Sequence, residues 1–370
     1  MSSDKKRGAV RIKYLARWTP SASSGVTWKI KNATHALKQC GYKADYAIVE
    51  KQGVVGHLLF VLEVAKASAE LLILRATAYS MLLVFPVLLI KRLMGVKVVV
   101  DVPTPMCSVL KEIDVSQNGW FKKLVLRSLI KASYPLSLFP ANRVVQYSLE
   151  SKRFSFGVER KTVLSANGIN VSSIQRVSLR RTREANSLNL IGVAALEDWH
   201  GYDRLIRGLK VYYSSPGVRW DVRFLVVGDG GARGRLELLV GSLGLNDRVK
   251  FYGVLTGTAL KEVFDHSDIG VSSLAVHRKG LKIASDLKTR EYLARGLPAI
   301  ICADDPDLTE EKPFLLRQPA DDSPINIESL VIWYAGIGCV GSDPDVIRDY
   351  AFKNFDYINK VSVYTKDLVA

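Results

Sequence analysis

Short apolar runs rich in β-branched residues alternate with longer stretches of helical period along most of the 370 residues. Parallel strands need a crossover connection, usually a helix, so this alternation predicts βαβ units and an α/β fold. In the first half we expect strands at 10–16, 44–50, 71–75, 96–101 and 143–147. In the second half we expect strands at 189–193, 223–227, 249–252, 269–272 and 299–302. The sequence therefore predicts two doubly wound, Rossmann-like halves.

The polar segment "VSLRRTREANSLN" (177–189) has no apolar periodicity and lies where the charge balance of the chain changes. We expect a linker there, between a domain over 1–180 and a second domain over 184–350, since the length suits two cores. Open α/β sheets bind ligands beyond the carboxyl ends of their strands. We therefore expect the site in a cleft between the two halves.

Cysteine usage and the apolar runs exclude several classes of protein. The four cysteines are scattered and form no CxxC, so we expect neither a disulfide framework nor a zinc site, and a reducing cytoplasm fits. The start "MSSDKKRGAV" lacks the apolar core of a secretory signal. The longest apolar run, "ATAYSMLLVFPVLLI", is shorter than a membrane-spanning helix and contains a proline. We expect it to form a buried or membrane-grazing helix.

The net excess of positive charge lies in the first half of the chain. Residues 1–180 hold 28 Lys and Arg against 10 Asp and Glu, or +18, and the rest of the chain carries −2. Such asymmetry predicts an anionic partner, which could be nucleic acid, a phospholipid surface or a phosphorylated acceptor. The alternative is a basic surface that serves solubility only.

The stretch "GWFKKLVLRSLIKASYPLSLF" has the pattern of a helix that lies on an anionic membrane. Lys123, Arg127 and Lys131 fall on one helical face, and Trp120 stands at its start. A core-facing helix with a solvated basic face is the alternative. The sequence has no stacking-aromatic platform or reading helix of a nucleic-acid module. We therefore expect a cytoplasmic protein that is peripheral on the inner face of the plasma membrane and binds no nucleic acid.

Two glycine-rich strand ends could approach an anion. Ser24 and Gly25 belong to a small-residue loop that opens a helix, where free amides attract phosphate, although a plain β-to-α turn has the same pattern. Gly230 lies in "VVGDGGARGRL", which is not a GxGxxG fingerprint at the right spacing, so a dinucleotide site is disfavoured.

The segment "ASDLKTREYLARGLPAI" carries the sharpest signal. Lys288, Thr289, Arg290 and Glu291 occupy the first turn of a helix, where cations and amide dipoles converge. This arrangement predicts a pyrophosphate cradle, and the carboxylate of Glu291 suits a pair of sugar hydroxyls. The alternative is a helix cap with a surface i,i+3 salt bridge.

The second half resembles the nucleotide-sugar domain of GT-B fold glycosyltransferases, in the large retaining family with a C-domain glutamate motif. The matching segments are "LIGVAALEDWHGYDRLIRGL", "RFLVVGDGGARGRLELLVGSLGLNDRVKFYGVL", "LKEVFDHSDIGVSSLAVHRKG" and "DLKTREYLARGLPAI". In the first half, "SSGVTWKI" is similar to the family's glycine loop. The chain looks most like transferases of capsule, exopolysaccharide or lipopolysaccharide assembly, and residues 351–370 look like the family's helix that crosses back to the first domain.

The resemblance implies roles for matching positions. Lys288 would contact the diphosphate of the donor, and Glu291 the ribose of its nucleotide. Gly25 would lie near the phosphate from the opposite domain, while Ser285 and Leu287 would shape the loop over the diphosphate. The remaining donor-binding candidates are Ser24, His200, Gly230, Arg278 and Thr289.

Three departures from the family pattern stand out. Ile283 replaces the first glutamate of the motif, so that contact with the donor sugar must be absent or supplied elsewhere. His200 replaces a phosphate-binding lysine and could act when protonated or as a neutral donor, or be a packed aromatic partner of Trp199. Many relatives carry a histidine after the fourth strand, where this chain has Asp101. Asp101 is then the catalytic candidate, as base or charge stabiliser, unless it only caps the turn.

The sequence thus predicts a glycosyltransferase that moves a sugar, with retention, from a UDP- or GDP-type donor to a lipid-linked or saccharide acceptor. No cofactor or metal is expected, since protein cations replace the metal and no carboxylate pair at metal spacing lies near the phosphate loop. The alternatives are a catalytically impaired nucleotide-sugar-binding subunit and a GT-B sugar-nucleotide epimerase.

Overall fold

The computed structural model describes residues 9–18, 25–102, 106–116, 118–147, 158–178, 185–337 and 343–369. The chain divides into two compact units, Met1–Gly168 with Tyr357–Ala370, and Ile169–Asp356. The division at Gly168 precedes the segment in which we expected the linker. The start of that segment belongs to the second unit, because the backbone N–H of Val177 donates to the carbonyl of Arg295 at 2.9 Å.

The first unit is built on a six-stranded parallel sheet in the order β2-β1-β3-β4-β5-β6. Its strands are β1 Arg11–Arg17, β2 Lys43–Val49, β3 Leu71–Arg75, β4 Lys97–Val102, β5 Arg143–Gln146 and β6 Thr162–Leu164. All five strands predicted for this half are confirmed. Strand β6 was not predicted, and it has only three residues and an exposed valine at its centre.

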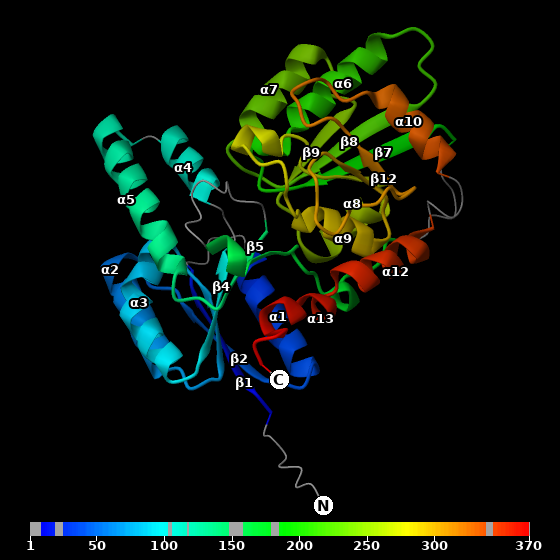
Figure 1. Cartoon of the computed structure of the whole chain (residues 1–370). Helices are drawn as coiled ribbons and strands as arrows, with labels where there is room; N and C mark the ends of the chain where they lie inside the picture. Colours follow the sequence, from blue (N-terminus) through cyan, green and yellow to red (C-terminus); the bar gives the residue numbers. More distant parts are fainter. Residues whose placement is uncertain are drawn as a thin grey trace, which may run out of the picture. The chain divides into compact units, whose positions relative to one another are not determined.

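Helices cover both faces of this sheet (Figure 1). They are α1 Gly25–Gln39, α2 Gly53–Lys66, α3 Ala78–Leu93, α4 Met106–Val115, α5 Trp120–Leu138, α13 Tyr357–Lys360 and α14 Ser362–Thr365, with the short 3₁₀ helix η2 Val158–Lys161. Helices α2, α3 and α5 share one apolar core with the sheet, through Phe60, Leu88 and Ile130 among others. Ile30 of α1 and Tyr364 of α14 belong to the core on the opposite face.

The second unit repeats the plan with the strand order β12-β11-β10-β7-β8-β9, all parallel. The strands are β7 Ser187–Val193, β8 Asp221–Val227, β9 Val249–Gly253, β10 Ile269–Val271, β11 Ala299–Ile301 and β12 Leu315–Arg317. The α-helices are α6 Tyr202–Ser214, α7 Arg233–Leu243, α8 Gly257–Asp265, α9 Leu287–Arg295, α10 Ile327–Gly336 and α12 Pro344–Phe355. Short 3₁₀ helices are η3 Val171–Ser173, η4 Asp198–His200 and η5 Val276–Lys279.

The connection after β7 runs toward β8, whereas the connection after β10 runs in the opposite direction toward β11. The neighbouring strands β7 and β10 therefore form the topological switch point of this sheet. Ligands of doubly wound sheets bind at such a point, outside the carboxyl ends of the strands. The five strands predicted for this half are confirmed, and β12 was missed.

Among the residues that the structure describes, no helix is long and apolar enough to cross a bilayer. The longest apolar run of the sequence forms most of α3, and one side of it is buried at Met81, Val84 and Leu88.

Candidate functional site

The loops that follow β7 and β10 meet the start of α9 at the switch point of the second sheet. Gly270 of β10 makes this approach possible, because a Cβ there would lie 2.3 Å from the ring of Tyr292 in α9. The Tyr292 hydroxyl then accepts from the backbone N–H of Val193 at 3.0 Å and donates to the carbonyl of Val271 at 3.1 Å. One buried side chain thus fixes α9 against the ends of both strands.

The first turn of α9 is left open by its own N-cap residue. Asp286 makes no capping bond to the helix; its carboxylate accepts from the Ser272 hydroxyl and from the Ser273 backbone N–H, each at 3.0 Å. The helix start therefore presents N–H groups that no capping side chain satisfies. Such groups bind anions.

Lys288 adds a cation to the same turn. Its half-buried amino group donates to the Ser273 hydroxyl at 3.1 Å. Burial lowers the pKa of Lys288 to about 8, although Asp286 opposes that shift. Burial raises the pKa of Asp286, but Lys288 and the serine hydrogen bonds outweigh this effect and hold it below the usual value. The turn thus holds a lysine beside backbone N–H groups that the Asp286 side chain does not cap.

His200 follows β7 and is buried between aromatic rings, with Trp199 at 5.9 Å and Tyr202 at 5.8 Å between centroids. Burial, helped by the charge of Lys288, lowers the pKa of His200 to about 3. The backbone N–H of Glu197 donates to its Nδ1 at 3.1 Å, which places the proton of the neutral ring on Nε2. The sequence left open a cation, a neutral hydrogen-bond donor and a packed aromatic partner of Trp199 for His200. The low pKa argues against the cation, whereas the ring contacts and the Nε2–H are compatible with the other two roles.

The other residues of the α9 start are either partly exposed or buried. Glu291 is partly exposed, and its Oε1 accepts from Arg295 at 2.7 and 3.0 Å, an i,i+4 pair in place of the expected i,i+3 pair. Arg290 is fully buried in an ion pair with Asp305 and is structural. Thr289 and Ser285 are also buried, the former against the Ser272 hydroxyl at 2.6 Å, and Leu287 is half-buried.

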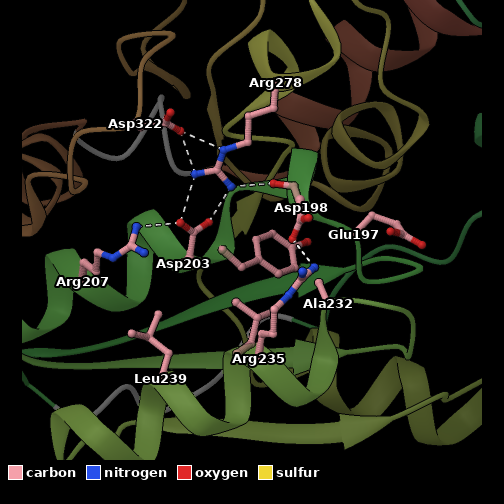
Figure 2. Close-up of a pocket in the computed structure, with 11 residues that line it drawn as sticks. Glu197, Asp198, Asp203, Arg207, Ala232, Arg235, Leu239, Arg278 and Asp322 are labelled. Atoms are coloured by element: carbon pink, nitrogen blue, oxygen red, sulfur yellow. Dashed lines mark hydrogen bonds and ion pairs between the residues drawn. The ribbon is translucent and has the colours of Figure 1, made fainter. Parts of the chain in front are cut away.

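Gly230 and Arg278, both expected to bind the donor, make contacts within the protein. A Cβ on Gly230 would lie 2.4 Å from the carbonyl oxygen of Leu196, so this glycine serves the packing of two loops. Arg278 donates through both Nη atoms to Asp203 at 2.9 and 3.0 Å, and through Nε to Asp322 at 2.8 Å. Figure 2 shows Arg278 held between these carboxylates at the rim of a cavity.

This cavity of about 540 Å³ is bounded by the starts of α6 and α7 (Figure 2). Its arginines are already paired with acids, Arg207 with Asp203 at 2.7 Å and Arg235 with Asp198 at 2.5 Å. A diphosphate would have to displace these carboxylates. The open first turn of α9 is therefore the better anion site.

Asp101, the candidate base, is buried in the first unit with 1% of its surface exposed. Its carboxylate accepts from the Tyr14 hydroxyl and from Arg75 at 3.0 Å, and Lys29 lies 3.6 Å away. Burial raises its pKa, but the two cations outweigh burial and keep the pKa below the usual value. A carboxylate so stabilised is a poor proton acceptor, so this geometry favours a structural role.

We expect Asp101→Asn to lower the free energy of unfolding by about 1–3 kcal/mol, because it leaves Lys29 and Arg75 without their counter-ion. Urea denaturation measures the loss. Turnover per folded molecule should change little. A large fall in kcat with unchanged stability would restore Asp101 as a catalytic residue.

The remaining predicted residues belong to the first unit. Gly25 opens α1, and Ser24 lies outside the described residues. On α5, Trp120 is 77% exposed and Lys131 is also exposed, whereas Lys123 donates to the carbonyl of Asp114 at 2.6 Å. Arg127 pairs with the carboxylate of the same aspartate. Two of the three predicted basic residues are therefore held by α4.

Ser273, Asp286 and Tyr202 were not predicted as parts of the site. The available signal was a pair of serines, Ser272 and Ser273, at the end of a predicted strand, with an aspartate at the next helix start. Among the described residues, no three His, Cys, Asp or Glu side chains come together as a metal site.

A protein-family model matches the second unit, and solved structures are similar over both units. Residues 188–324 match the family model described as Glycosyl transferases group 1. No curated protein sequence matches the chain. HepE of Anabaena, solved in complex with UDP, has a TM-score of 0.62 at 16% identity and covers 95% of this chain and 97% of its own.

Two further solved structures are similar over the whole chain. A glycosyltransferase from Rickettsia africae ESF-5 has a TM-score of 0.66 at 14% identity, covering 98% of this chain and 100% of its own. WaaG, a glycosyltransferase involved in lipopolysaccharide biosynthesis, has a TM-score of 0.54 at 13% identity, covering 96% and 100%. At these identities the likeness shows a shared fold.

Proposed function

The chain has the GT-B fold and carries a glycosyl transferases group 1 domain over residues 188–324, and on this premise we propose that it is a glycosyltransferase. Its donor is a nucleotide-diphosphate sugar of UDP or GDP type, and its acceptor is a lipid-linked saccharide in polysaccharide assembly. The observation that carries the proposal is the open first turn of α9, where uncapped N–H groups lie beside Lys288.

We propose the following contacts between the donor and the described residues. The amides of the α9 start and the amino group of Lys288 bind the diphosphate, since both present positive charge to an anion. The Nε2–H of His200 supplies a neutral hydrogen bond in place of a second cation. Glu291, one turn along α9 and partly exposed, accepts the ribose hydroxyls, while Leu287 and Ser285 shape the loop.

The reaction we propose is transfer with retention and without a metal. The leaving diphosphate takes the acceptor proton, so the enzyme needs no carboxylate base, in keeping with the buried ion-paired state of Asp101. Ile283 is half-buried and pairs with Asp304 through the backbone. Its aliphatic side chain has no polar atom, so it gives the donor sugar no hydrogen bond. We expect Lys288 and the α9 amides to stabilise the charge on the departing diphosphate.

Two observations support a lipid-linked acceptor at a membrane. The first 180 residues carry +18, which suits an anionic surface. The similar structures include WaaG and the lipopolysaccharide outer core galactosyltransferase WaaB. We propose that the protein is peripheral on the cytoplasmic side of the plasma membrane.

A nucleotide screen by thermal shift, followed by mass spectrometry of nucleotide sugars incubated with lipid extracts, tests the function. We expect stabilisation by UDP or GDP and a product that contains the acceptor. Binding without sugar release under any acceptor would indicate a binding subunit instead. Product formed without an acceptor would indicate an epimerase.

We expect Glu291→Ala to weaken UDP or GDP binding by about 1–3 kcal/mol, through loss of charge-assisted hydrogen bonds to the ribose. Calorimetry with the 2′-deoxy nucleotide isolates this contact, because removal of the hydroxyl should cost affinity in the unmodified protein and little in the variant. Glu262→Ala, at an exposed position on α8, is the control. Equal losses from the 2′-deoxy change in both proteins would contradict the assignment.

A further inference from the structure

Helices α2, α3 and α5 form one layer on a single face of the first sheet (Figure 1). Their inner sides are buried in one core, through Phe60 and Val64 of α2, Val84 and Leu88 of α3, and Ile130 of α5. The opposite sides of all three helices therefore point away from the sheet, in the same general direction.

These outer sides are unusually apolar. On α2, Val54, Val55, Leu58, Leu59 and Leu62 are 41–73% exposed, and their spacing places them on one helical stripe. Seventeen of the 27 large apolar side chains exposed among the described residues belong to these helices or to their C-cap residues. The others on α3 and α5 with their caps are Leu83, Leu89, Ile90, Leu93, Met94, Trp120, Phe121, Leu124, Val125, Leu129, Leu136 and Phe139.

The three stripes belong to one continuous surface. His57 of α2 hydrogen-bonds Ser80 of α3 at 2.8 Å, and Lys91 donates to the carbonyl of Ala67 at the end of α2 at 2.7 Å. On the other side of α3, the rings of Phe85 and Phe139 lie 6.4 Å apart. The exposed apolar side chains therefore form one continuous surface across the three helices and are not isolated from one another. Monomeric soluble proteins rarely expose such faces without a partner.

The charges on the layer are almost all of one sign. Helices α2, α3 and α5 contain seven lysines and arginines against one acid, Glu63. Arg92 is exposed at the end of α3, and Lys122 and Lys131 are exposed along α5. An apolar face surrounded by cations is complementary to a bilayer with anionic headgroups, whose interface takes up apolar and aromatic side chains.

We propose that the outer face of the α2–α3–α5 layer docks into an anionic lipid bilayer. Its aliphatic stripes enter the boundary between headgroups and acyl chains, and the lysines and arginines contact the headgroups. This inference deepens the proposed function, since a lipid-linked acceptor lies at such a surface. It also extends the expectation of a single basic helix to three helices, because α2 and α3 supply ten of the seventeen exposed apolar side chains.

A second copy of the chain fits this face less well. A twofold dimer through the same face would bring two like-charged layers together, and like charges in an interface oppose association. An acidic bilayer instead gains from each of these cations.

The test uses the full chain in flotation with vesicles of phosphatidylcholine alone and of an equimolar mixture with phosphatidylglycerol. We expect binding to the mixed vesicles. The variant Leu58→Ser/Ile90→Ser/Leu93→Ser should lower the partition coefficient by about tenfold or more, because apolar burial drives insertion. The matched control Val211→Ser/Leu238→Ser/Ile332→Ser changes three exposed apolar residues of the second unit and should float normally. Arg92→Gln/Lys122→Gln/Lys131→Gln should reduce the preference for phosphatidylglycerol.

Melting curves and UDP or GDP affinity, measured on every variant, confirm that each is folded. Flotation of the first serine variant equal to that of the unmodified protein would overturn the proposal. The proposal would also be overturned if the unmodified protein were an oligomer by size-exclusion chromatography and this variant dissociated the oligomer without changing flotation. If the unmodified protein binds nucleotide but does not float with vesicles, the docking proposal is wrong and the proposed function is unaffected. If it floats with vesicles but binds no nucleotide, the proposed function is wrong and the docking proposal is unaffected.

Discussion

Lys288→Ala should weaken the binding of UDP or GDP by about 1–3 kcal/mol, the loss of one charge-assisted hydrogen bond. The amino group of Lys288 is held by Ser273 at 3.1 Å at the open end of α9, so it is already positioned before the ligand arrives. Calorimetry with the nucleoside diphosphate and with the free nucleoside separates the two parts of the ligand. The variant should lose affinity for the diphosphate and keep its weak affinity for the nucleoside.

Lys282→Ala is the matched control, because this lysine lies in the same loop and is exposed. We expect it to leave the affinity nearly unchanged, as for an exposed cation screened by solvent and salt. Equal effects of the two substitutions would show that Lys288 contributes only to the net charge of the loop.

Arg290→Met should lower the free energy of unfolding by about 3–5 kcal/mol, the usual cost of removing one partner from a buried ion pair. The guanidinium of Arg290 is fully buried and bonds Asp305 at 2.7 and 2.8 Å and Asp307 at 3.1 Å. Methionine roughly fills the space but leaves two acids without their counter-ion. Urea denaturation of the full chain measures the loss.

The exposed pair of Arg235 and Asp198 gives the comparison. Arg235→Met should cost about 0–1 kcal/mol, as surface ion pairs do. If Arg290→Met were equally mild, the buried network would not hold the start of α9 in place, and the geometry of the site would need another explanation.

The fold was largely predictable from the sequence, and the α/β, GT-B expectation is confirmed. Eight of the ten predicted strands are central, and a central parallel strand is buried on both faces and reads as a short apolar run. The other two, β2 and β9, are edge strands of seven and five residues. The missed strands β6 and β12 have three residues each, "TVL" and "LLR", and lie at the edges of their sheets. An edge strand of that length leaves too little periodicity to recognise.

The site was predictable only in part. The sequence places Lys288 and Arg290 in one helical turn, yet Lys288 borders the open helix end and Arg290 is buried. The difference depends on Asp305 and Asp307, which follow β11 and meet Arg290 only in the folded chain. The ion pair of Asp101 was not visible in the sequence for the same reason, since Arg75 comes from β3.

The sequence also indicated only part of the proposed docking face, namely the helix α5. Apolar side chains on α2 and α3 fit a buried helix as well as a docking face, and the sequence cannot tell which side the sheet covers. The structure separates the two sides, with Leu88 buried and Ile90 59% exposed on the same helix.

Hydrogen–deuterium exchange of the full chain, with and without saturating UDP or GDP, shows whether the first turn of α9 binds the diphosphate. We predict slower exchange in the backbone amides of residues 287–291, because the diphosphate would accept hydrogen bonds from the first turn of α9. Bound nucleotide that leaves these amides unchanged and protects only the segments around Asp203 and Arg278 would contradict the account and move the site to the cavity between α6 and α7.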